Sequence, residues 1–144
     1  MAFDCITARR RAIRRQGTPP LYEVENRMPD VASPAPAEFV VVLITVPDDE
    51  VAGRLAHTLV SEKLAACVNV LPSVRSVYAW EGKICNEGEL LCLVKTRREL
   101  FPALRERVLA LHPYQVPEIV ALPLVEGSDM YLAWLRESTR PGCP

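Results

Sequence analysis

The stretch "FVVVLITVPDDEVAGRLAHTLVSEKLAACVNVL" (residues 39–71) decides the fold. Residues 39–46 form an apolar, β-branched run of strand length that a proline ends. Asp48 then offers a helix N-cap, and apolar residues recur every four positions across 51–59, which predicts an amphipathic helix. Residues 67–71 are strand-like again. The stretch is therefore predicted to form one β-α-β unit.

The remainder of the chain continues this alternation. The predicted elements are a continuation of the second strand at 74–80, a turn at 81–83, a strand at 88–95, a helix carrying an apolar stripe at 100–111, a strand at 117–125 and a helix at 130–138. The order β-α-β-β-α-β plus a terminal helix predicts an α+β, ferredoxin-like sandwich, in which two helices cover one face of an antiparallel sheet. The second and fourth strands are expected at the sheet edges, where their prolines are tolerated.

Three of the predicted strands are apolar at odd and even positions alike. They are "VVVLITV" (40–46), "LLCLV" (90–94) and "IVALPLV" (119–125). A sheet with one solvated face alternates apolar and polar residues instead. Both faces must therefore be covered, and the two crossover helices cover only one. We expect the terminal helix to cover part of the second face and a partner subunit to cover the rest.

Composition divides the chain into a domain and two flanks. The predicted parts are a disordered N-terminal arm at 1–38, a domain at 39–138 and a tail at 139–144. The arm is polar and proline-rich, with five arginines between Arg9 and Arg15. No apolar run of secretory-signal type follows this basic block, so we expect a cytoplasmic protein, with the mitochondrion as the alternative for an Arg-rich start. No stretch predicts a transmembrane segment.

Five stretches closely resemble the CutA family of divalent-cation-tolerance proteins in vertebrate-like form. They are "EKLAACVN" (62–69), "SVYAWEGKI" (76–84), "VKT" (94–96), "LHPYQVPEI" (111–119) and "YLAWL" (131–135). The resemblance covers residues 39–138. It implies a ferredoxin-like subunit in a stable homotrimer akin to the PII signalling proteins, with hairpins that pair edge to edge between subunits. Such pairing removes exposed strand edges.

The resemblance implies two functions that the residues do not separate. Bacterial members are linked to copper tolerance and copper binding, so the first hypothesis is a trimer that responds to divalent metal ions. Mammalian members are linked to the anchoring or processing of acetylcholinesterase. The second hypothesis is therefore a structural trimer that assists partner proteins, without a metal role.

The family's proposed copper ligands are a cysteine and two adjacent histidines. The matching positions of this chain hold Ile44, Leu111 and His112, so only His112 could ligate a metal. One ligand predicts at most weak binding of copper or another divalent cation, unless three copies meet at a symmetry axis. No cofactor is expected to be required. His112 also precedes a proline at the predicted end of a helix, which favours a structural role.

Kinship with the PII proteins also implies a cleft between subunits that could hold a small anion or metabolite. The candidate residues are Tyr78, Trp80, Lys95, Tyr114, Glu118 and Trp134. Packing and an interface salt bridge are the simpler interpretation of the same residues.

Catalytic and nucleic-acid functions are not expected. Neither histidine of the chain stands in a nucleophile motif, and no Gly-rich phosphate loop is present, so we predict that the chain is not an enzyme. RNA-binding domains of this fold stack bases on aromatic residues of the central strands. The predicted third strand, "GELLCLVK" (88–95), has no aromatic residue, which excludes that function.

Overall fold

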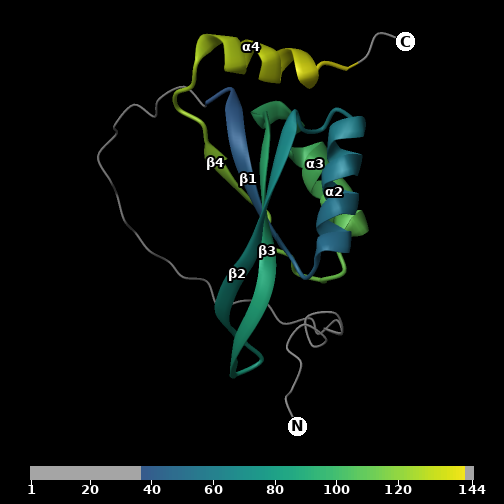
Figure 1. Cartoon of the computed structure of the whole chain (residues 1–144), viewed down its shortest axis with the longest axis vertical. Helices are drawn as coiled ribbons and strands as arrows, with labels where there is room; N and C mark the ends of the chain where they lie inside the picture. The colour runs from purple at the N-terminus through teal and green to yellow at the C-terminus, as the bar shows by residue number, and fades with distance from the viewer. Residues whose placement is uncertain (1–36, 142–144) are drawn as a thin grey trace, which may run out of the picture.

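The computed structural model describes residues 37–141. In chain order the elements are β1 (Phe39–Val46), α2 (Asp49–Ser61), β2 (Cys67–Trp80), β3 (Lys83–Arg97), the 3-10 helix η1 (Arg98–Leu100), α3 (Phe101–Leu111), β4 (Val120–Pro123) and α4 (Asp129–Ser138). The four strands form one antiparallel sheet in the order β2-β3-β1-β4. This topology confirms the predicted ferredoxin-like fold, with β2 and β4 at the edges (Figure 1).

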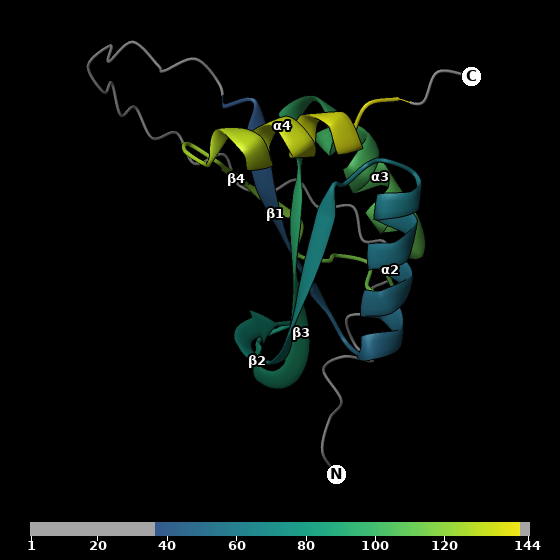
Figure 2. The ribbon, with the colours of Figure 1, turned by 45° about the horizontal axis from the view of Figure 1, so that its top comes forward.

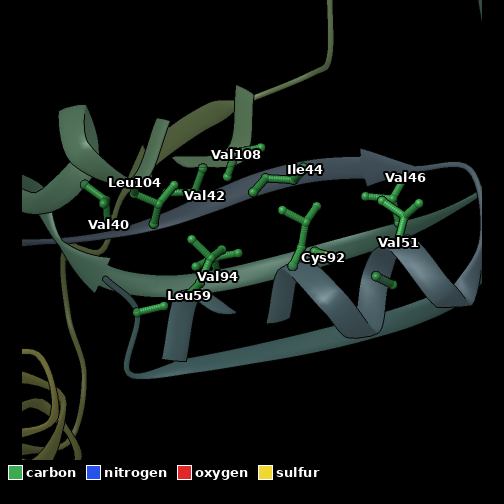
Figure 3. Close-up of a cluster of buried hydrophobic side chains, with 13 residues drawn as sticks. Val40, Val42, Ile44, Val46, Val51, Leu59, Cys92, Val94, Leu104 and Val108 are labelled. Carbon is green, nitrogen blue, oxygen red and sulfur yellow. The ribbon is translucent and has the colours of Figure 1, made fainter. Parts of the chain in front are cut away.

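The main core lies between one sheet face and the two crossover helices. Alternate residues of β1, from Val40 to Val46, point into it together with Cys92 and Val94 of β3 (Figure 3). From the helices, Leu59 of α2 inserts into the same layer, as do other apolar residues at helical spacing. The stripes found in the sequence therefore face the sheet, as the period of an amphipathic helix requires.

The β2–β3 hairpin extends well beyond the other two strands (Figure 1). Its turn consists of Glu81 and Gly82, whose φ angles are 48° and 76°. Two positive φ angles in a two-residue loop suit the right-handed twist of the flanking strands. Pro72 and Ser73 interrupt the ladder as a bulge between Leu71 and Val74, where Ser73 has a φ of 62°. The predicted break at the proline is thus a bulge within one long strand.

Two local expectations differ from the structure. The fourth strand spans only four residues, because just these residues pair with β1. The spacing Thr96-x-x-Glu99 predicts a capping box at the start of the second helix. Thr96 instead lies within β3, and its hydroxyl donates to the Leu64 carbonyl at 2.6 Å. Pairing with β1 prolongs β3 to Arg97, so the tertiary ladder overrides the local capping signal.

The folded part extends slightly past the predicted boundaries of 39 and 138. The Glu38 carbonyl accepts the Arg98 amide at 2.8 Å, and the Glu38 carboxylate forms an ion pair with Arg136 of α4. That ion pair lowers the pKa of Glu38. Thr139 is 1% exposed, and its carbonyl accepts a 2.7 Å hydrogen bond from Arg97. These contacts hold the C-terminal end of α4 to the sheet. The predicted arm, apart from its last two residues, lies outside the described residues.

The second face of the sheet is the open face, defined here by Val41, Leu43, Leu71, Leu91, Leu93, Val120 and Leu122. On β1 and β3 these residues alternate with the residues that point into the core. On β2 and β4 they pair with open-face residues of the neighbouring strand. Helix α4 crosses one end of the sheet (Figure 2). Its Leu135 packs there with Phe39 of β1. Leu71, Val120 and Leu122 remain exposed. No element among residues 37–141 covers the centre of the open face, as the apolar pattern of the strands led us to expect.

Candidate functional site

His112 ends α3, as predicted from the proline that follows it. Its backbone is extended, with φ −77° and ψ 136°, while its amide still donates to the Val108 carbonyl at 2.8 Å. The imidazole is buried. Its Nδ1 accepts the Tyr114 amide at 3.1 Å, and its Nε2 lies 2.9 Å from the Thr45 carbonyl. A carbonyl only accepts, so Nε2 carries the proton and the ring is the neutral Nε2–H tautomer.

These hydrogen bonds bear directly on metal binding by His112. A neutral imidazole ligates a metal through its unprotonated nitrogen, which here is occupied by the Tyr114 amide. At the other two positions matching the bacterial ligands, Ile44 is fully buried in the core and Leu111 packs against it. Within residues 37–141, no three His, Cys, Asp or Glu side chains gather into a group able to hold a metal ion. A metal at His112 would have to displace a hydrogen bond and recruit ligands from elsewhere.

Beside this histidine is a cavity of about 350 Å³ with an acidic lining. It is lined by Thr45, Ser76, Val77, Tyr78, Glu89 and Glu118. Glu89 is only 3% exposed and accepts a 3.1 Å hydrogen bond from the Tyr114 hydroxyl. Three of the six predicted cleft residues, Tyr78, Tyr114 and Glu118, are thus brought together around Glu89.

Sequence reasoning missed Glu89, although it left a signal. Glu89 stands in the apolar run of the third strand, at a position that the strand period assigns to the open face. A carboxylate in such a run is costly to bury unless it has partners. That conflict could have marked the residue as part of a site.

Two other predicted cleft residues lie at the opposite end of the open face, next to α4. Lys95 pairs in register with Cys67 of β2, whose thiol interacts electrostatically with Tyr131. Burial and this contact raise the pKa of Tyr131. The Tyr131 ring in turn stacks on Trp134, with centroids 5.3 Å apart. This end therefore carries an ammonium group and two aromatic rings.

The sixth residue, Trp80, belongs to neither group. It pairs with Lys83 at the end of the hairpin. Its indole Nε1 is buried and has no hydrogen-bond partner in the described part of the chain. Within one chain, the six predicted residues thus lie in three places rather than in one cleft.

The thiol of Cys92 is unreactive at neutral pH. It lies in the main core, and desolvation raises its pKa to about 11. The reactive form of a cysteine is the thiolate, which is scarce so far below the pKa. Cys92 is therefore a packing residue of the main core.

The part of the chain that matches known proteins coincides with the folded domain. The family model described as "CutA1 divalent ion tolerance protein" matches residues 40–138. The chain is 61% identical over 99 residues to the "Divalent-cation tolerance protein CutA" of Thermus thermophilus, covering 69% of this chain and 96% of that relative. It is 49% identical over 114 residues to "Protein CutA, chloroplastic" of Arabidopsis thaliana, covering 79% and 62%. The chain thus spans less than two thirds of the plant relative.

A solved structure repeats this match in three dimensions. The divalent cation tolerance protein (Cut A1) from Thermus thermophilus superposes with a TM-score of 0.69 at 59% identity, covering 71% of this chain and 99% of that one. The family-model match at residues 40–138 includes the sheet, the helices and the residues around His112.

Proposed function

The chain belongs to the CutA1 divalent ion tolerance protein family, and from this premise we propose that it is a trimer that acts in the response to divalent metal ions. The match across residues 40–138 carries the proposal. The Thermus relative, named for divalent-cation tolerance, is matched over 96% of its length.

The open face supports the assembly part of the proposal. Its apolar centre has no cover among residues 37–141, and a monomer with such a surface would tend to aggregate. A ring of three copies would bury it. The long hairpin, with the edge strand β2, is suited to pair with an edge of a neighbouring copy, which would remove unpaired backbone groups.

Any copper bound by the chain is proposed to be weakly held. The unprotonated nitrogen of His112 is already hydrogen-bonded, and the neighbouring positions offer no further nitrogen or sulfur ligand. Metal would then act as a transient ligand rather than a permanent cofactor.

Titration of the purified full-length protein with Cu²⁺, with bound metal counted per subunit, tests this. We expect at most weak binding, and little change when His112 is replaced by asparagine. A tight site that disappears in His112→Asn, with the fold intact, would overturn the weak-binding proposal.

The second candidate function is a structural one, in which the trimer assists partner proteins such as acetylcholinesterase. The apolar side chains of Val125, just before α4, and Met130, in its first turn, are more than four fifths exposed and favour it. Copurification of a stoichiometric protein partner, together with no metal-dependent phenotype on deletion, would favour this function over the first.

For localisation we propose the cytoplasm, with an organelle as the alternative. The plant relative is named chloroplastic, and the Arg-rich segment of this chain precedes the matched domain. Imaging the full chain beside a chain that begins at Ala37 distinguishes the two, because only an organellar pool would depend on the removed segment.

A further inference from the structure

The ammonium of Lys95 is buried, and it has no anionic partner in the described part of the chain. Lys95 is only 8% exposed. Its Nζ donates to the side-chain carbonyl of Asn69, and to the Leu93 carbonyl at 3.2 Å. Both acceptors are neutral. No carboxylate among residues 37–141 forms an ion pair with this group. A buried charge is costly unless an opposite charge compensates it.

The acidic cavity carries carboxylates without a neighbouring cation among its described lining residues. Glu118 is half-buried and lines the cavity, yet it has neither a hydrogen-bond partner nor an ion-pair partner in the described part of the chain. The carboxylate of Glu89 lines the same cavity and already accepts the Tyr114 hydroxyl. No basic side chain of residues 37–141 lines the cavity. Glu118 is therefore the carboxylate available to a cation from outside.

Lys95 and Glu118 cannot readily meet within one chain. Lys95 lies level with Val41 on β1, whereas the cavity that holds Glu118 includes Thr45, four residues further along the same strand. Four residues of extended strand span about 13 Å. The apolar centre of the open face separates the two groups, with positive charge at one end and negative charge at the other.

We infer that Lys95 of one copy forms an ion pair with Glu118 of a second copy when the open faces assemble. This inference rests on the proposed assembly and names the residue that each copy contributes. The occupant is a second copy because its surface carries both requirements, a matching apolar face and a free carboxylate at its margin. The predicted cleft residues at one end of the open face would then lie next to those at the other end of the open face of a second copy.

A charge swap tests the pair directly. Lys95→Glu and Glu118→Lys are each expected to raise the dissociation constant of the full-length assembly by on the order of 100-fold or more, because each brings two like charges together. The double variant restores opposite charges and should return to within about tenfold of the parent. Sedimentation at a series of protein concentrations measures the constant.

Lys63→Glu, Glu126→Lys and their combination are matched controls, since both positions are exposed and the charges change identically. They should shift the constant only a few-fold. If a swapped chain fails to fold, the isosteric variants Lys95→Met and Glu118→Gln replace it. Coupling between these two, measured as a departure from additivity in the double variant, supports the pair.

Three results would overturn the inference. In the first, the effects of the two single substitutions on the dissociation constant simply add in the double variant, in the charge swap or in the Met/Gln pair. In the second, the single variants raise the dissociation constant no more than the control variants do. The third is stabilisation of the parent by inorganic phosphate that Lys95→Met abolishes and Glu118→Gln does not, which would make a small anion the partner of Lys95. A monomeric parent would instead show that the proposed assembly itself is wrong, so the two failures are distinguishable.

Discussion

At the scale of single residues, His112 shows how a chemically suggestive side chain is used for structure. Its two ring nitrogens join the end of α3 to the next turn and to β1, through Tyr114 and Thr45. The tilted contact of its ring with Tyr114, at 4.8 Å between centroids, places the tyrosine near Glu89. The histidine therefore shapes the acidic cavity while it does not line it.

A pair of substitutions separates these hydrogen bonds. In His112→Asn the side-chain oxygen can still accept the amide two residues on, as in an Asx-turn, but it is too short to reach Thr45. His112→Ala loses both bonds and leaves buried polar groups unpaired, at a cost of about 1–3 kcal/mol each. We expect the unfolding free energy to fall in the order parent, Asn, Ala in urea titrations. Equal stability of all three would contradict the structural role.

At the scale of secondary structure, the two amphipathic helices α2 and α4 begin differently. Asp48 precedes α2 and its carboxylate accepts the Val51 amide at 2.9 Å, which satisfies one of the free donors of the first turn. Ser128 holds the same position before α4 but makes no such bond. Helix α4 is instead held by tertiary contacts of its far end, where Arg97 binds Thr139.

This contrast predicts different costs for the same kind of change. Asp48→Ala should lower the unfolding free energy by about 1 kcal/mol, because a capping hydrogen bond is lost. Ser128→Ala is the matched control, and we expect it to cost only a few tenths of a kcal/mol. Chemical denaturation of both variants measures the difference. A larger loss at Ser128 than at Asp48 would show that capping does not distinguish the helices.

At the scale of the whole molecule, the open face is the feature that calls for assembly. Light scattering after size exclusion should give three times the chain mass of 16.1 kDa. A charge placed on the open face should disrupt the trimer, since a carboxylate buried without a partner is strongly unfavourable. Leu122 is suited to this test, because it is 47% exposed and lies on the edge strand β4.

Leu122→Asp should therefore reduce the measured mass towards one chain. The matched control is Leu109→Asp: Leu109 is similarly exposed, at 43%, but it lies on α3, away from the open face. The control should remain a trimer. Disruption by both variants, or by neither, would contradict the assignment of the open face as the interface.

Much of this architecture followed from the sequence because it depends on neighbours along the chain. The periods of β1 and α2, the proline after His112 and the turn at Gly82 are local signals, and the structure confirms each of them. The doubly apolar strands also predicted an open face, since alternation along a strand reports directly on burial of its two sides. The similarity to one family rested on short stretches of the same local kind.

Only the tertiary structure decided how distant residues combine. It placed Lys95 and Glu118 at opposite ends of one face, gave Thr96 to a strand rather than to a cap, and centred the acidic cavity on Glu89. These outcomes depend on strand register and on contacts between residues far apart in sequence. A period of two or of 3.6 residues assigns a side chain to a face but leaves its partner across the sheet undetermined.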